Sequence, residues 1–230
     1  MQVRTSAYNA RMPDIASILH KLSVVAIPAL FAITLHEVAH GWMARSLGDP
    51  TAQLEGRLSL NPLRHIDPIG TVVLPIVLLM LNGPIFGWAK PVPVAFANLR
   101  NPRRDMIFVA AAGPSSNLFM ALFWAVLAGL QLSVLQIGGV AGTWILAVCD
   151  AGIVINVILA VFNMLPIPPL DGGRVLAGLV PPKTARLLDR IEPFGILIVL
   201  VLLYTVLWDW LGPIVDAFTI FFVSIAGLFV

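Results

Sequence analysis

Long apolar runs separated by short polar stretches dominate this sequence. A bilayer core about 30 Å thick needs about 20 consecutive apolar helical residues to cross it. Three runs reach that length, at about Leu22–Leu47, Met106–Leu132 and Trp144–Leu165. A last apolar stretch, about Phe194–Val230, is interrupted from Asp209 to Pro213 and is typical of a helical hairpin with a short first arm. The pattern predicts five to six membrane-crossing segments.

Two other stretches predict different structure. The run from Asp67 to Asn82 has sixteen residues, with two prolines and a glycine among them. It is short for a crossing and is typical of a re-entrant element. The following stretch, Gly83–Val94, contains Pro91 and Pro93, and alternating prolines exclude a helix. We expect a short edge strand or hairpin there. The prolines lack a backbone N–H, so only one edge of such a strand could pair with a neighbour.

Composition agrees with a membrane location. The chain is 59% hydrophobic and 11% charged, whereas a soluble domain is about 45–50% apolar and about 25% charged. Its single cysteine, Cys149, excludes an intrachain disulfide and a thiolate metal cluster. A formal charge of only +2 gives no reason to expect a nucleic acid partner. The sequence therefore predicts an all-α membrane protein, with residues 1–230 forming one polytopic helical bundle in the lipid bilayer.

The string His36-Glu37-Val38-Ala39-His40 lies in the last third of the first long run. Residues four apart share one face of a helix about 6 Å apart, so both imidazoles can reach one ion. Glu37 lies beside that face, where a carboxylate can take a proton from water activated by a metal. A charged group inside a membrane costs at least about 2.5–3.5 kcal/mol on insertion scales, so such residues are seldom kept without a partner. We interpret the string as a zinc site.

Two histidines require a third protein ligand. The candidates are His20, His65, Asp49, Glu55, Asp67, Asp150 and Asp171. Asp171 stands out because prolines before it end the fourth run, and Gly172 and Gly173 after it allow a tight turn that presents the carboxylate. A plain Asp-Gly turn between two segments is equally consistent with these residues alone.

Five motifs follow one another along the chain: His36-Glu37-x-x-His40, Gly87-Trp88-Ala89-Lys90-Pro91-Val92-Pro93-Val94, Ala112-Gly113-Pro114-x-x-Asn117, Asn163-x-x-Pro166 and Leu170-Asp171-Gly172. In their residues and their order they resemble the site-2 protease family of intramembrane zinc metalloproteases. They run from about residue 30 to about residue 195. The likeness is to a minimal form, without an inserted PDZ domain or an appended nucleotide-sensing module.

The resemblance implies a site and an activity. One Zn²⁺ per chain would be bound by His36, His40 and Asp171, with Glu37 as the general base. The same family pattern places Asn163, Asn117 and Pro166 at the substrate peptide. The expected substrate is a membrane-spanning segment cut within or near the bilayer.

Zinc geometry also predicts a topology. His40 lies near the end of the first run and Asp171 lies just past the fourth, so both ends must be on one membrane face. The runs at Met106–Leu132 and Trp144–Leu165 supply two crossings, and Asp67–Asn82 must then dip in and return. The positive-inside rule leaves both topologies open, since each gives eleven cations against three. We expect five crossings, the N-terminus outside, the C-terminus inside and a site that opens to the cytoplasm.

Other functions are consistent with the same residues. A membrane zinc transporter or sensor could use the same ligands, but it would not need Glu37. An inactive protease-like scaffold would bind no zinc. The stretch Gly87–Val94 could pair with an extended substrate by strand addition, or it could simply pack as a loop at the interface. Assembly into a homo-oligomer stays open.

Overall fold

The computed structural model describes residues 15–80 and 87–229. Every regular element in these residues is helical. In chain order the elements are α1 (Ile15–Ser46), α2 (Thr51–Leu54), η1 (Pro62–Arg64), η2 (Pro68–Val73), α3 (Leu74–Met80), η3 (Phe96–Asn98), α4 (Pro102–Leu130), η4 (Gln131–Leu135), α5 (Gly139–Asn163), α6 (Asp171–Leu179), α7 (Pro182–Ile191), η5 (Glu192–Phe194), α8 (Gly195–Thr205) and α9 (Leu207–Gly227). The predicted all-α class is confirmed.

Four of the described helices are long and apolar enough to cross a membrane. They are Leu19–Ser46 in α1, Pro102–Leu135 in α4 with η4, Gly139–Asn163 in α5, and Leu207–Gly227 in α9. The three runs predicted from the pattern are thus confirmed, each with ends that differ by a few residues. The predicted count of five to six crossings is not confirmed.

The C-terminal stretch differs from the predicted hairpin. Its first arm is α8, which has 11 residues and is therefore only about 16 Å long. The break falls at Val206, between α8 and α9, and not at the predicted Asp209–Pro213. Pro213 lies inside α9, where a membrane helix tolerates proline because neighbouring groups can satisfy the freed backbone.

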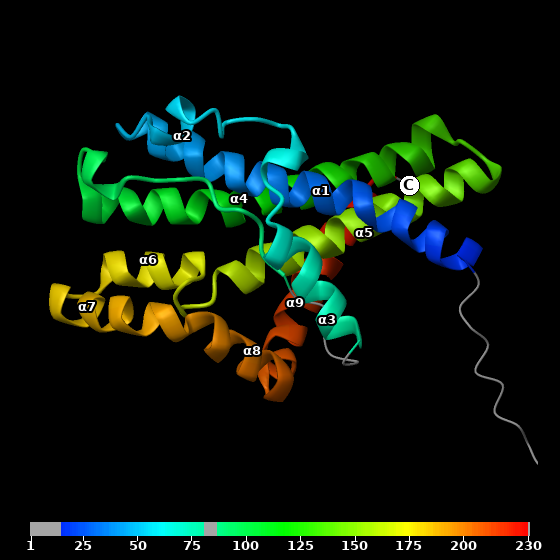
Figure 1. Cartoon of the computed structure of the whole chain (residues 1–230). Coiled ribbons are helices and arrows are strands. Elements are labelled where there is room, and N and C mark those ends of the chain that lie inside the picture. The colour runs from blue at the N-terminus through cyan, green and yellow to red at the C-terminus, as the bar shows by residue number, and fades with distance from the viewer. Residues whose placement is uncertain (1–14, 81–86, 230) are drawn as a thin grey trace, which may run out of the picture.

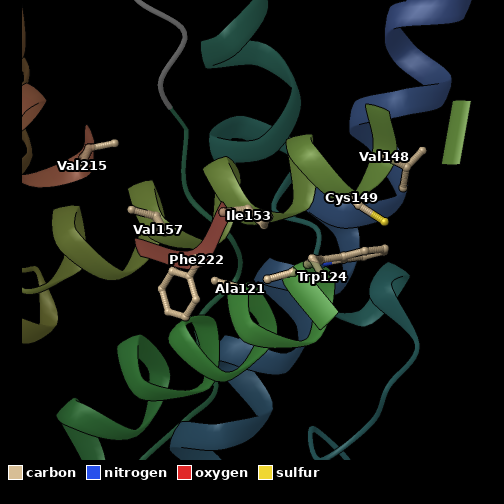
Figure 2. Packing of buried hydrophobic residues seen from close by; sticks show 9 residues of the cluster. Ala121, Trp124, Val148, Cys149, Ile153, Val157, Val215 and Phe222 are labelled. Atoms are coloured by element: carbon tan, nitrogen blue, oxygen red, sulfur yellow. The ribbon is translucent and has the colours of Figure 1, made fainter. Parts of the chain in front are cut away.

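Helices α1, α4, α5 and α9 form the bundle (Figure 1). Apolar side chains of α4, α5 and α9 fill one half of it, and Figure 2 shows Trp124 and Ala121 of α4 beside Ile153 of α5 and Phe222 of α9. A Cβ added to Gly129 of α4 would lie 2.5 Å from the ring of Phe229, so the C-terminal end of α9 lies beside the C-terminal end of α4.

Two contacts locate the start of α1 relative to the end of α9. Trp144 Nε1 near the start of α5 donates a 3.0 Å hydrogen bond to Ser23 Oγ near the start of α1. The start of α1 and the end of α9 thus lie at the same end of the bundle. The predicted placement of the two termini on opposite faces is not confirmed, because α8 is too short to add a crossing.

The stretch between α1 and α4 covers one flank of the bundle. Elements η2 and α3 together have 13 residues, about 20 Å of helix. The N–H of Trp88 donates to Gly70 O at 3.2 Å, so the chain that leaves along η2 returns beside its own start. Residues 87–95 form no strand, and the predicted hairpin residues 83–86 lie outside the described part. The predicted strand is not confirmed.

Helix α4 begins where its sequence provides a cap. Pro102 occupies the first helical position, where a missing N–H costs nothing. The Asp105 carboxylate accepts the N–H of Asn101 at 2.8 Å. Helix α6 packs against this first part of α4, and Arg103 Nε donates to Gly178 O at 3.1 Å. This contact holds the end of α6 at the start of α4, so α6 lies along the first part of α4.

Candidate metal centre and active-site cavity

Three side chains from two distant helices converge at one point. His36 Nε2 and His40 Nε2 of α1 lie 3.1 Å apart. Asp171 Oδ2, from the first residue of α6, lies 3.2 Å from His36 Nε2 and 3.4 Å from His40 Nε2. Ligand atoms held tetrahedrally about 2.0–2.1 Å from zinc are separated by about 3.3–3.4 Å. The spacing therefore fits one zinc ion with a fourth position left for water or substrate.

The donor set also fits a metal by its chemistry. Asp171 Oδ2 is buried, and no described residue gives it a hydrogen bond. Two imidazole nitrogens and a carboxylate oxygen suit zinc. Within the described part of the chain, these three residues are the group of histidine and acidic side chains whose ligand atoms lie close enough to share an ion.

Each imidazole is oriented by its other nitrogen. His40 Nδ1 lies 2.7 Å from Val109 O of α4, and a backbone carbonyl can only accept, so Nδ1 carries the proton. His36 Nδ1 lies 2.6 Å from Asn117 Oδ1, also of α4. Both Nε2 atoms are thus left with lone pairs that face Asp171. Partners of this kind raise ligand basicity and fix ring orientation in metal sites.

Gly113 of α4 allows the helices to approach this closely. A Cβ at Gly113 would lie 2.4 Å from His40 Nε2 and 2.7 Å from His36 Cε1. Real Cβ atoms do not come so near, so any other residue would push α4 away from the imidazoles. In the sequence Gly113 stands out only as part of a family motif, and its close approach to the imidazoles is visible only in the tertiary contact.

Asp171 is presented by a helix start, and not by the predicted tight turn. It is the first residue of α6, and a carboxylate is favoured at a helix N-terminus. Gly172 and Gly173 follow because that helix packs on the preceding loop: their Cβ atoms would lie 2.2 Å from Met164 O and 2.4 Å from Pro168 N.

Glu37 is held beside the metal centre by the chain that crosses in front of α1. The N–H of Val92 donates to Glu37 Oε2 at 2.7 Å. Trp88 and Lys90, on the same edge of that segment, donate to Gly70 O at 3.2 Å and to His65 O at 2.9 Å. The segment is therefore pinned along one edge at every second residue, and its middle fixes the carboxylate.

A cavity of about 970 Å³ opens next to these groups. His36, Glu37, His40 and Asp171 form its polar floor, and apolar side chains from α1, α5, α8 and the segment 87–96 form most of its walls. Arg174, one turn after Asp171, also lines it. Its guanidinium lies 5.2 Å from the Phe96 ring centroid, and its Nη2 lies 3.5 Å from Glu192 Oε1. Arg174 was not predicted from the sequence, because no motif separates it from the other cations.

Of the three residues expected to contact substrate, only Asn163 lines the cavity. Asn163 lines the cavity, and its Nδ2 donates to Leu159 O at 2.9 Å. Pro166 is exposed in the turn after α5 and lies outside the cavity lining. Asn117 is fully buried and its Oδ1 faces His36, behind the metal centre. Their predicted contacts with substrate stay predictions.

The rival ligands have other structural partners or lie apart. The Asp49 carboxylate accepts hydrogen bonds from Ala95 N at 2.7 Å and Asn98 Nδ2 at 3.0 Å, which ties the segment before α4 to the end of α1. His65 is buried, with Nε2 2.8 Å from Ser59 O. Asp67 caps η2 by accepting the N–H of Gly70 at 2.7 Å. His20 and Asp150 are exposed on α1 and α5, and Glu55 caps the end of α2.

Comparison with known proteins now agrees with the geometry. The family model described as Peptidase family M50 matches residues 123–206, which include Asn163 and Asp171. YwhC of Bacillus subtilis, whose name describes a zinc metalloprotease, is 37% identical over 208 residues, covering 86% of this chain and 89% of its own. The chain belongs to Peptidase family M50. This is the site-2 protease family, so the predicted membership is confirmed, and the protein is a membrane zinc metalloprotease.

More distant members of the family are longer. Rip2 of Mycolicibacterium smegmatis and Rip2 of Mycobacterium tuberculosis H37Rv, also named as zinc metalloproteases, are each 33% identical over 76% and 75% of this chain. The chain spans 64% and 63% of their lengths. No solved structure gives a significant match.

Proposed function

We propose that this M50 peptidase hydrolyses peptide bonds within or near transmembrane segments, with one zinc ion held by His36, His40 and Asp171. The observation that carries the proposal is the tetrahedral spacing of these three ligand atoms beside Glu37. A zinc ion bound there supplies Lewis acidity for the substrate carbonyl and lowers the pKa of water.

Glu37 acts as the general base. Its Oε2 is held by Val92 N–H, so Oε1 is the atom left to accept the proton of the attacking water. The carboxylic acid formed then returns that proton to the leaving amine. A carboxylate fixed in this way moves the proton without first reorganising, which lowers the cost of reaching the transition state.

The cavity selects an unwound apolar segment. Its walls are largely apolar, and a helix hides its carbonyls in internal hydrogen bonds. The segment around Ala89 uses one backbone edge for contacts with Gly70, His65 and Glu37. Its opposite edge, with the N–H and C=O of Ala89, can take an extended substrate by strand addition. Asn163, at the cavity wall, orients that peptide. Pro166 shapes the turn that follows Asn163.

The topology follows from which elements lie at which end. Helices α4 and α5 supply two crossings between His40 and Asp171, while η2 and α3 form a re-entrant element that returns at Trp88. With α9 as the fourth crossing, the eleven Lys and Arg residues from Arg45 to Arg190 lie toward the metal end, and Lys21, near the start of α1, lies toward the other. The positive-inside rule then favours a metal end in the cytoplasm, with the start of α1 and the end of α9 at the outer face of the cell membrane.

Zinc analysis and one isosteric variant test this function. Purified protein should contain one zinc per chain, and Asp171→Ala should contain far less. Glu37→Gln should keep its zinc but cleave a membrane substrate about 10²–10⁴-fold more slowly. A transporter or sensor would be indicated if Glu37→Gln kept full function. A wild-type protein without zinc would indicate an inactive scaffold. Proteomic comparison of cells with wild type and Glu37→Gln would identify the substrate that accumulates.

A further inference from the structure

Two asparagine side chains lie entirely inside the membrane bundle behind the metal centre. Asn117 of α4 and Asn156 of α5 are both 0% exposed. Asn117 Nδ2 donates to Asn156 Oδ1 at 2.9 Å, and Asn156 Nδ2 donates to Gly152 O at 2.8 Å. Buried amides within membrane spans are costly, and the groups one turn away along α5, Gly152 and Ala160, are small and apolar. The pair is therefore not explained by packing alone.

The direction of each hydrogen bond in this chain of contacts is fixed from one end. Gly152 O can only accept, so Asn156 must present Nδ2 to it and Oδ1 to Asn117. Asn117 must then present Nδ2 to Asn156 and Oδ1 to His36. Because Oδ1 can only accept, His36 Nδ1 carries the proton, and the lone pair of Nε2 is left for a metal.

A second contact supports the same orientation more weakly. Asn117 Nδ2 also donates to Ala32 O of α1, at 3.2 Å. This bond is longer than the one to Asn156 at 2.9 Å. Without Asn156, the Asn117 amide would keep one anchor and gain freedom to rotate. The His36 ring would then be oriented less firmly than the His40 ring, whose Nδ1 contacts the backbone oxygen of Val109 directly.

We infer that Asn156 is a positioning residue that acts through Asn117 to set the tautomer and ring orientation of His36, and so the affinity of the zinc site. The inference rests on the proposed function only in taking His36 as a zinc ligand. Asn156 is not among the residues that line the cavity, and hydrogen bonds link it to His36 only through Asn117. The three spans α1, α4 and α5 are joined by this set of bonds at the depth of the ligands.

The test measures metal affinity and ligand geometry on purified full-length protein. Zinc affinity is obtained by competition with a chromogenic chelator, and the cobalt-substituted protein gives d–d bands that report coordination. Loss of such partners typically weakens metal binding about 10–100-fold. We expect about 10-fold weaker zinc binding and altered cobalt bands for Asn156→Leu, and a loss nearer 100-fold for Asn117→Leu.

Two further variants separate positioning from general packing. Asn156→Asp keeps an oxygen acceptor for Asn117 Nδ2, so it should restore most of the affinity and the cobalt bands lost in Asn156→Leu. Ile153→Ala lies one turn away on α5 and is fully packed, so it should lower stability while leaving zinc affinity unchanged. If Asn156→Leu fails to fold, Asn156→Ala replaces it in the same measurements.

The outcomes distinguish this inference from the proposed function. Wild-type protein that binds no zinc would overturn the function itself. Wild-type protein that binds zinc, with Asn156→Leu indistinguishable from it in affinity and spectrum, would overturn only the inference. The inference also fails if Ile153→Ala weakens zinc binding as much as Asn156→Leu does, or if Asn156→Asp is no better than Asn156→Leu.

Discussion

The interface between α4 and α5 has two halves with different chemistry. Away from the metal, Ala121 and Trp124 of α4 pack on Cys149 and Ile153 of α5 without a polar contact between them (Figure 2). Less than two turns closer to the metal, the same two helices are joined through Asn117 and Asn156. One half is held by shape alone, and the other by hydrogen bonds of fixed direction.

The difference follows from what each half must do. Lipid is as apolar as a helix surface, so packing in a membrane depends on close fit between small and large side chains. Such contacts tolerate small rotations of the helices. A zinc site does not, because a ligand misplaced by 1 Å can cost about 100-fold in rate. Directional bonds to buried amides and carbonyls remove that freedom around His36 and His40.

The largest effect on stability should come from the apolar half. Ile153→Ala removes a side chain that is 1% exposed, and such changes usually cost about 2–5 kcal/mol in the free energy of unfolding. Unfolding in detergent, followed by circular dichroism, measures this loss. Zinc content per folded chain should not change. An Ile153→Ala protein that folds normally but lacks zinc would show that zinc binding in the polar half depends on packing in the apolar half.

A large effect on zinc binding should come from adding a single methyl group in the polar half. Gly113→Ala would place a Cβ 2.4 Å from His40 Nε2 and displace the imidazole. We expect about 100-fold weaker zinc binding and activity, which corresponds to about 2.7 kcal/mol. Gly212→Ala in α9 is the matched control, because its Cβ would meet nothing within 4 Å. Equal behaviour of the two variants would contradict the close approach of α4.

A polar contact outside the membrane gives a comparison that can be followed by pH. Burial opposes ionisation of Asp49, but bonds from Thr51, Asn98 and Ala95 outweigh it, so the pKa of Asp49 lies below its ordinary value of 3.8. A lowered pKa stabilises the folded protein above pH 3.8, and this stability is lost as the pH falls through the folded value.

We therefore expect acid to release the segment before α4, seen as protease cleavage near residues 95–98. Asp49→Asn should cost about 1.5–3 kcal/mol at neutral pH, the usual range for hydrogen bonds to a charged group. It should also remove the pH dependence below 3.8. An unaltered acid profile in Asp49→Asn would assign the release to other carboxylates.

The smallest effect is expected for one atom in the apolar half. Trp124 Nε1 is buried, and no described residue accepts a hydrogen bond from its N–H. Trp124→Phe removes this unsatisfied N–H but leaves a small gap, so the two terms nearly cancel and stability should change by about 1 kcal/mol or less. Thermal unfolding measures it. A loss of several kcal/mol would show that the indole N–H has a partner after all.

Local sequence signals predicted the elements that are self-contained. Three long apolar runs became α1, α4 and α5, and His36 and His40 face one point because helix geometry alone places residues i and i+4 together. Signals that depend on tertiary context failed. The break expected at Asp209–Pro213 lies at Val206 instead, and the prolines after Gly87 gave an extended segment without a strand partner.

The sequence by itself determined the membrane class, the paired histidines with Glu37 and the family, since these depend on composition, helical period and local motifs. Only the tertiary structure decided that Asp171, and not Asp49 or His65, lies beside the two histidine nitrogens. It also decided that Gly113 and Asn117 lie against the imidazoles. The physical reason is that ligand convergence and close approach join residues far apart in the chain, and no local pattern encodes the distance between them.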